Sequence, residues 1–464
     1  MYEADTELDL MEALGVAIEA AEKAGSIIWQ SVEKRRAAAA AAATVRGTSK
    51  NRNVHNTGTA DPGVSPSSAL QIETKASPTD LVTQYDKQCD EVITRVLYHY
   101  VKDVQKEKPH LRFCFLTEEL NPSTPLTDDY TWVVDPIDGT MSFVHGLPDC
   151  CISIGLTHRK QPVLAVVFTP FICSGVRLTT AASAVLRSIQ QQTQPQPPSL
   201  FISGGQNCAT TTSPVPAIVD AREAKRPGDA AAGALPMAPP SIPPAVAAKL
   251  NKKTNADPKI ETRMPVSAAA AAALPTTAHS SHSMVPECNG ELFTAIRGQG
   301  AFLNGRRLHV NRKATPSTSL VVLNYPYGVA LTTEEAASPD AAEIRRCRHR
   351  EAIDCSAQIL EELAQLPVSG MRCYGSCVTT LAQIAAGRAD AYLEPASKAW
   401  DVCAGSLLVT EAGGVVRNML GEEFDMARDT TIVAAANQEM AELFTKRCVD
   451  HKFGRFWLLE KAVK

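Results

Sequence analysis

Two aspartates follow a short apolar run near residue 133, and their spacing suits metal-bound phosphate chemistry. Residues 132–140 read Trp-Val-Val-Asp-Pro-Ile-Asp-Gly-Thr. Val133 and Val134 can bury in a sheet, while Asp135 and Asp138 emerge at the carboxyl end of the strand, where open α/β sheets place their ligands. The two carboxylates would then hold cations beside a phosphate.

The residues around these acids form a turn that could receive an anion. Pro136 fixes its own φ, so the turn is stiff. Gly139 and Thr140 open the next segment, and the free backbone N–H groups at a helix start can bind an anion. This segment is therefore a candidate phosphate-binding turn.

Further carboxylates stand at the ends of other expected elements. Glu118 and Glu119 follow a short strand, and Asp401 begins a helix. Each acid also has a structural interpretation: the glutamates as a solvated loop pair, Asp401 as a helix N-cap, and Asp86 as the partner of Thr83 in a capping box. Spacing alone does not show that these acids converge.

Composition places the chain among ordinary globular proteins. It has 464 residues, is 44% hydrophobic, and its 46 basic and 50 acidic residues give a formal charge of −4. This balance does not indicate a nucleic-acid partner. The acidic N-terminus and the lack of a long apolar stretch predict no membrane association and a cytoplasmic location. The 13 scattered cysteines predict reduced thiols rather than disulfides or a zinc site.

The first half of the chain alternates helices, strands and two low-complexity segments. An amphipathic helix is expected over 6–36, and a flexible insert over 37–72. A helix follows Thr83, and residues 151–156 and 162–168 predict a hairpin. Residues 172–286 are rich in Gln, Pro, Ala and Ser and predict a disordered insert.

The edges of the second insert indicate where it lies in the fold. Residues 166–168 before it and 291–295 after it could pair as consecutive strands, so the insert would sit at a hairpin tip. The expected organisation is a metal- and phosphate-binding α+β part (1–171 with 287–315), the insert (172–286), and an α/β part (316–464). That last part alternates strands and helices from Leu320 onward.

Several motifs together resemble the inositol monophosphatase family, in its inositol-1-monophosphatase branch. They are Leu116-Thr-Glu-Glu, Trp132-Val-Val-Asp-Pro-Ile-Asp-Gly-Thr and Trp400-Asp-Val-Cys-Ala-Gly, supported by Lys75-Ala-Ser-Pro-Thr-Asp-Leu-Val-Thr, Gly298-Gln-Gly-Ala-Phe-Leu-Asn-Gly, Tyr374-Gly-Ser-Cys and Thr410-Glu-Ala-Gly-Gly. The match is specific and covers nearly everything except the two inserts.

The resemblance implies a fold and an activity. The fold is an alternating α-β-α-β-α sandwich of the inositol monophosphatase and fructose-bisphosphatase type. The activity is magnesium-dependent, lithium-sensitive hydrolysis of a small phosphate monoester, most of all myo-inositol monophosphate, with two or three Mg²⁺ ions. A homodimer is expected, with no nucleic-acid or membrane partner.

The resemblance also implies a role for each site residue. The metal ligands are Glu118, Asp135, the Ile137 carbonyl, Asp138 and Asp401, with Asp135 bridging two ions. Thr140 and Asp86 orient the attacking water, while Lys75 and Glu119 support the site. The N–H groups of Gly139 and Thr140 hold the phosphate. The residues that contact the alcohol portion are Gly375, Ser376, Cys377, Glu394 and Asp401.

Departures from the family pattern leave the substrate open. Thr117 replaces a usual glycine, Cys377 a common alanine, and Lys398 lies in a loop that often carries other residues. Other small sugar, histidinol or nucleotide phosphates are alternative substrates. A non-catalytic scaffold whose disordered insert binds partners is an alternative of another class, although the intact acid set argues against it.

Overall fold

The structure, a computed structural model, describes residues 7–48, 72–74, 81–172, 182–193, 290–325, 338–429 and 431–451. All of these belong to one compact unit made of residues 1–193 and 275–464. A second unit, residues 194–274, lies outside the described residues, as does most of the insert expected over 172–286. No described helix is both long and apolar enough to cross a lipid bilayer.

A seven-stranded sheet forms the first half of the unit. Its strands, in spatial order, are β3 (Phe113–Thr117), β4 (Tyr130–Asp138), β5 (Cys151–His158), β6 (Gln161–Thr169), β7 (Glu291–Ile296), β8 (Gly300–Leu303) and β9 (Arg306–Arg307). β3 and β4 are parallel, and the other neighbours are antiparallel. The hairpin predicted from residues 151–168 is confirmed, and so is the pairing of the strands that flank the insert.

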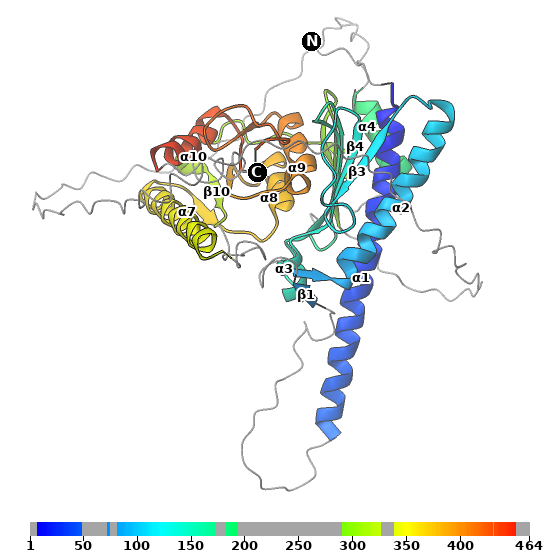
Figure 1. The fold of residues 1–464 in the computed structure, drawn as a ribbon, viewed down its shortest axis with the longest axis horizontal. Coiled ribbons are helices and arrows are strands. Elements are labelled where there is room, and N and C mark those ends of the chain that lie inside the picture. The colour runs from blue at the N-terminus through cyan, green and yellow to red at the C-terminus, as the bar shows by residue number, and fades with distance from the viewer. Residues whose placement is uncertain are drawn as a thin grey trace, which may run out of the picture. The chain divides into compact units, whose positions relative to one another are not determined.

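Two helices cover one face of this sheet. α1 (Leu10–Thr48) and α2 (Gln84–Glu107) run side by side (Figure 1) and pack against β4, β5 and β6. A short antiparallel pair, β1 (Ile72–Thr74) with β2 (Leu81–Thr83), precedes α2. α1 extends past the predicted end of the helix, so residues 37–48 are helical rather than a flexible insert. These residues are mainly alanine, which has the highest helix propensity and continues a helix without tertiary contacts.

A second difference lies inside the expected disordered insert. Residues 182–193 form helix α4 (Ala182–Thr193), in which Val185 and Ile189 are buried. Leu186 of the same helix packs close to Gly15 of α1. These apolar residues lie at helical spacing within a polar run, and the average composition of the insert concealed them.

A five-stranded mixed sheet forms the second half. Its strands, in spatial order, are β11 (Gly370–Arg372), β10 (Leu320–Leu323), β12 (Ala391–Glu394), β14 (Ile432–Ala435) and β13 (Val415–Arg417). The 3-10 turn η3 (Pro316–Thr318) leads into β10. The helices α8 (Cys377–Ala385) and α9 (Ala399–Glu411) contact both sheets, while α7 (Pro339–Gln365) and α10 (Gln438–Asp450) pack together beside the second sheet (Figure 1).

The layers therefore alternate helices and sheets, as the sequence predicted. Side chains of β4 alternate between the two covered faces, since Trp132 and Val134 join the core under α1 and α2, and Val133 joins the core under α8 and α9. All nine residues of β4 are buried. Because strand side chains alternate in direction, Asp135 points to the same face as Val133, toward α8 and α9.

Candidate active site

The carboxyl end of β4 carries the two aspartates of the central motif. The pairing with β5 is regular through Asp135 and resumes at Asp138 after a bulge. Pro136 lacks the N–H that a regular ladder needs, and a bulge re-aims the side chains beside it. The Ile137 N–H donates to Asp135 Oδ1 at 3.0 Å, which fixes one carboxylate oxygen. The bulge thus brings both acids toward one point.

Glu118 reaches this point from the neighbouring strand. β3 runs parallel to β4 with Thr117 opposite Val134, so Glu118 follows β3 where Asp135 continues β4. Its N–H donates to the Val134 carbonyl at 3.1 Å, and its carboxyl hydrogen-bonds that of Asp135. The structure therefore brings together these two acids, which lie far apart in the sequence. Glu119 is half-buried in the same loop.

Asp401 joins the cluster from the first turn of α9. Its Oδ2 accepts a hydrogen bond from the Lys398 N–H at 2.6 Å, which caps the helix. One ligand oxygen from each of Asp135, Asp138 and Asp401 lies within 4.8 Å of the others. The interpretation of Asp401 as the N-cap is wrong, because Lys398 is the N-cap and Asp401 is the third helical residue, whose carboxylate reaches back to it. The same residue takes part in the acidic cluster.

Asp138 is tied to the segment that opens α8. Its Oδ2 accepts hydrogen bonds from the Ser376 hydroxyl and from the Val378 N–H, the latter at 2.7 Å. Ser376 is also the N-cap of α8, where its hydroxyl accepts from the Thr379 N–H at 3.0 Å. Asp138 is therefore hydrogen-bonded directly to Ser376, one of the residues predicted to contact the alcohol portion of the substrate.

The cluster is electrostatically crowded. Burial raises the pKa of Asp135 well above its ordinary value, and the nearby charges of Glu118, Asp138 and Asp401 raise it further. Burial also raises the pKa of Asp401 strongly and that of Asp138 to about 6. Carboxylates this close together repel one another when ionised, and a bound cation would relieve that repulsion. These side chains can hold a metal ion.

Thr140 and Asp86 form a second, adjacent pair. Thr140 opens the short helix α3 (Thr140–His145), and its hydroxyl oxygen lies 3.0 Å from Asp86 Oδ1 and 3.2 Å from the Ile137 carbonyl. The other Asp86 oxygen accepts from the Thr83 N–H at 2.9 Å and the Thr83 hydroxyl at 2.5 Å. Asp86 is therefore both the capping-box residue of α2 and the partner of Thr140.

Gly139 is required at the turn between β4 and α3. Its φ is +89°, in the left-handed region, and a Cβ there would lie 2.7 Å from the Asp149 carbonyl. Asp149 also accepts from the Gly375 N–H at 2.8 Å through Oδ2, so the turn and the 375–377 segment are held together. Lys75, the remaining predicted catalytic residue, lies outside the described residues.

Cys377 and Glu394 complete the predicted alcohol side. Cys377 is the first residue of α8 and is buried, and burial raises the pKa of its thiol well above the ordinary value. A thiol with such a pKa is protonated and a poor nucleophile. Glu394 ends β12 and is buried, and burial raises its pKa to about 7.

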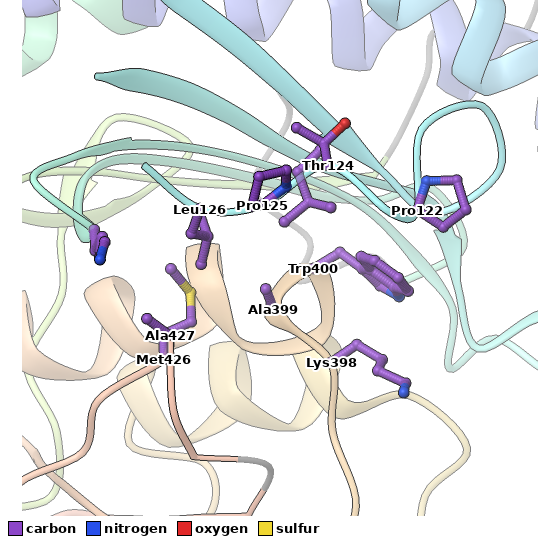
Figure 2. A pocket seen from close by; sticks show the side chains of 11 residues that line it. Pro122, Thr124, Pro125, Leu126, Lys398, Ala399, Trp400, Met426 and Ala427 are labelled. Carbon is purple, nitrogen blue, oxygen red and sulfur yellow. The ribbon is translucent and has the colours of Figure 1, made fainter. Parts of the chain in front are cut away.

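A pocket of about 430 Å³ lies beside the acidic cluster. Pro122, Pro125 and Leu126 line one side, and the start of α9 with Trp400 lines another (Figure 2). None of the cluster carboxylates lines this pocket, but Trp400 directly precedes Asp401. Lys398 lies at this pocket, so its side chain flanks the site rather than joining the cluster.

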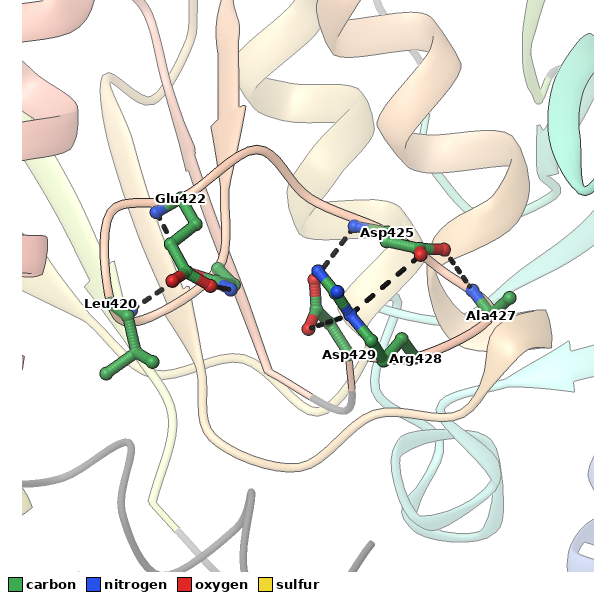
Figure 3. A network of polar contacts seen from close by, with 7 residues as sticks. Leu420, Glu422, Asp425, Ala427, Arg428 and Asp429 are labelled. Atoms are coloured by element: carbon green, nitrogen blue, oxygen red, sulfur yellow. Dashed lines mark hydrogen bonds and ion pairs between the residues drawn. The ribbon is translucent and has the colours of Figure 1, made fainter. Parts of the chain in front are cut away.

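The opposite wall of this pocket is a loop fixed by its own hydrogen bonds. Met426 and Ala427 line the pocket, and the Ala427 N–H donates to Asp425 Oδ1 at 3.0 Å. The Asp425 N–H donates to Asp429 Oδ2 at 2.8 Å (Figure 3). These hydrogen bonds hold the loop together internally, and Met426 also packs into the buried core.

Asp90 is a site residue that sequence reasoning missed. It is fully buried in α2, one turn after Asp86, and its Oδ2 accepts from the N–H groups of Glu119 and Leu120 at 3.1 and 3.0 Å. These are the two residues after Glu118, so Asp90 fixes the loop that presents this acid. The sequence did offer one signal for Asp90. It lies four residues after Asp86, and residues at this spacing share a helix face, so Asp90 could be expected near Asp86.

Replacing Asp90 tests this positioning role. Asp90→Asn keeps the side-chain shape but weakens two charge-assisted hydrogen bonds, so the Glu118 loop should move more freely. We expect the Mg²⁺ concentration for half-maximal activity to rise roughly tenfold, as changes behind metal ligands typically cause. Activity at saturating Mg²⁺ should change little. A Mg²⁺ titration of phosphate release measures both quantities.

Thr94→Val is the matched control for Asp90→Asn. The Thr94 hydroxyl donates to Asp90 Oδ1 at 2.9 Å, whereas the N–H groups of Glu119 and Leu120 donate to Oδ2. This variant should therefore keep the wild-type Mg²⁺ dependence. An unchanged Mg²⁺ titration in Asp90→Asn would show that Asp90 has only a structural role.

Carboxylates gathered at a sheet end beside a glycine turn could hold metal ions next to a phosphate, and comparisons with known proteins show the class of protein. The profile of the inositol monophosphatase family matches residues 9–212 and 265–452. The chain belongs to the inositol monophosphatase family and is a phosphatase of that superfamily.

Individual relatives are distant but similar over most of their length. Inositol monophosphatase 2 of Solanum lycopersicum is 25% identical over 443 residues, which cover 93% of this chain and 96% of the relative. Inositol monophosphatase 1 of Homo sapiens is 22% identical over 380 residues, covering 81% and 84%. The solved structure of a Thermotoga maritima IMPase has a TM-score of 0.48 and 17% identity, covering 95% of this chain and 99% of that one.

Proposed function

We propose that this protein hydrolyses a small polyol phosphate monoester in the presence of Mg²⁺, with myo-inositol monophosphate as the leading substrate. The observation that carries this proposal is the convergence of Asp135, Asp138 and Asp401 next to the Thr140–Asp86 pair. The names of the relatives, inositol monophosphatases of plants and animals, support the choice of alcohol.

Magnesium is the metal that the donor set favours. The converging ligand atoms are all carboxylate oxygens, and Glu118 adjoins them through Asp135. Hard oxygen ligands without histidine or thiolate suit Mg²⁺ better than zinc. When bound between such acids, two or three Mg²⁺ ions supply charge stabilisation for the attacking and leaving oxygens of an in-line displacement. The Ile137 carbonyl is a further proposed ligand.

The Thr140–Asp86 pair is proposed to orient the attacking water. Burial raises the pKa of Asp86 to about 6, so above that pH Asp86 is mostly a carboxylate that accepts a hydrogen bond from the Thr140 hydroxyl. The Thr140 oxygen then keeps its lone pairs for a proton of the water. Backbone N–H groups of Gly139 and Thr140 are proposed to bind the phosphate, with Lys75 and Glu119 supporting the site from the side.

A phosphate-release panel in Mg²⁺ ranks the substrates. Inositol 1-phosphate should be turned over faster than fructose 1,6-bisphosphate, histidinol phosphate and 3′-phosphoadenosine 5′-phosphate, because Ser376, Cys377 and Glu394 are proposed to contact the alcohol portion and Ser376 hydrogen-bonds Asp138. A protein without enzymatic activity on any of the four would favour the scaffold alternative. Turnover confined to the nucleotide would contradict the choice of substrate.

Other properties expected from the sequence or from the resemblance stay predictions. These are the homodimer, the sensitivity to lithium, the cytoplasmic location and the division at residue 316 between the two parts of the chain. No disulfide joins two cysteines among the described residues.

A further inference from the structure

Glu394 lies in a buried hydrogen-bond network at the end of β12. Its Oε2 accepts from the Tyr392 hydroxyl at 2.5 Å and from Asn324 Nδ2 at 2.8 Å. Its Oε1 accepts only a longer bond of 3.3 Å, from the Ala396 N–H, among the contacts of the described residues. Oε2 is therefore saturated, and Oε1 retains capacity for another donor.

Asn324 connects this network to the other side of the site. It follows β10, is only 3% exposed, and its backbone N–H donates to the Leu393 carbonyl at 3.1 Å. Its Nδ2 donates to Glu394 Oε2 and also to the Tyr392 hydroxyl oxygen, the latter at 3.0 Å. Its Oδ1 accepts from the Tyr374 N–H at 3.3 Å, directly before Gly375. One amide side chain thus holds both Glu394 and the segment that leads to α8.

The surroundings of Glu394 make these donors important. Burial and the nearby charge of Asp138 both oppose a negative charge on Glu394 and raise its pKa. The hydrogen bonds that Glu394 accepts from Tyr392, Asn324 and the Ala396 N–H act in the opposite direction. Donors from Tyr392 and Asn324 favour the ionised form against the cost of burial.

We propose that Asn324, together with Tyr392, is a positioning residue that holds Glu394 ready to accept hydrogen bonds from the hydroxyl groups of the substrate's alcohol portion. The inference rests on the proposed function and deepens it, because it assigns selectivity for polyhydroxy phosphates to a residue of β10. A substrate whose alcohol portion carries no hydroxyl groups cannot donate hydrogen bonds to Glu394, so its binding affinity does not depend on Asn324 or Tyr392.

Steady-state kinetics of Asn324→Leu on two substrates test the proposal. Loss of the amide should raise KM for inositol 1-phosphate about tenfold or more, since a hydrogen bond to a charged group is lost. The kcat on that substrate should change much less, because the metal ligands and the Thr140–Asp86 pair are untouched. KM for phenyl phosphate, which has no hydroxyl group, should stay at the wild-type value.

Tyr392→Phe is a second variant that removes only one hydroxyl from the network. It should give the same selective rise in KM even if Asn324→Leu fails to fold. Tyr100→Phe is the matched control, since the buried Tyr100 hydroxyl has no hydrogen-bond partner among the described residues. In a Glu394→Gln background, Asn324→Leu should add little to KM, because Asn324 acts through the Glu394 carboxylate.

The outcomes separate this inference from the proposed function. Equal losses on inositol 1-phosphate and phenyl phosphate would show that Asn324 and Tyr392 are merely structural and would overturn the inference alone. A wild-type protein that hydrolyses neither substrate in Mg²⁺ would contradict the proposed function, and the inference would fall with it.

Discussion

Asp135→Asn is expected to abolish Mg²⁺-dependent phosphate release. Asp135 is the acid on which the charges of Glu118, Asp138 and Asp401 converge, so its carboxylate is the one most able to serve more than one cation. The loss of activity should exceed the roughly 10- to 100-fold effects of changes behind metal ligands. Phosphate release at saturating Mg²⁺, measured for wild type and variant, gives the ratio directly.

The same substitution should stabilise the metal-free protein at neutral pH. A carboxyl whose folded pKa is raised contributes stability that is present below its ordinary pKa and is lost as pH rises through the folded pKa. At pH 7.5 an ionised Asp135 would therefore be unfavourable, and Asn removes that charge. Thermal unfolding without metal should show a higher Tm for Asp135→Asn at pH 7.5, with a smaller difference at pH 4.

Asp103→Asn is the control for both measurements. Asp103 lies on the exposed face of α2 in an ion pair with Lys106 and does not belong to the acidic cluster. It should leave activity and Tm close to those of the wild type, since exposed pairs contribute little. Wild-type activity in Asp135→Asn would contradict the proposed metal site.

The sequence pointed to acids that the structure brings together, but it did not show how they meet. Glu118 and Asp135 are neighbours because β3 and β4 pair in parallel with Thr117 opposite Val134, and strand register cannot be read from a motif. Asp401 depends on α9 packing between the sheets. The resemblance to a family, rather than spacing, suggested that these loops converge.

The agreement between predicted and observed helices and strands depended on local sequence patterns. The helical spacing in α2 and the strand pattern around the hairpin were strong enough to predict these elements. Average composition failed for α4, where Val185 and Ile189 are buried within a polar run, and for residues 37–48, where alanine continues α1. Asn324 and Asp90 were missed because their role depends on tertiary hydrogen bonds, to which a single sequence gives no guide.

Thr140→Val should lower kcat by about 10²- to 10⁴-fold, the range associated with a positioned proton-transfer group. Valine has nearly the shape of threonine, so α3 and the glycine turn before it should persist. The hydroxyl that links Asp86 to the proposed water is lost, whereas the acids of the metal cluster remain. The Mg²⁺ concentration for half-maximal activity should therefore stay near the wild-type value, which separates this effect from a loss of metal.

Thr83→Val is the matched control, because it makes the same substitution on the opposite oxygen of the same carboxylate. Thr83 caps α2 through Asp86 Oδ2, whereas Thr140 contacts Oδ1. Loss of the cap should cost about 1 kcal/mol of stability and lower Tm, with kcat changed only a few-fold. If Asp86 served only as a capping residue, Thr83→Val would be the more damaging variant and Thr140→Val nearly silent. The opposite order of effects on kcat is expected, because the carboxylate uses one oxygen to hold its helix and the other to hold Thr140.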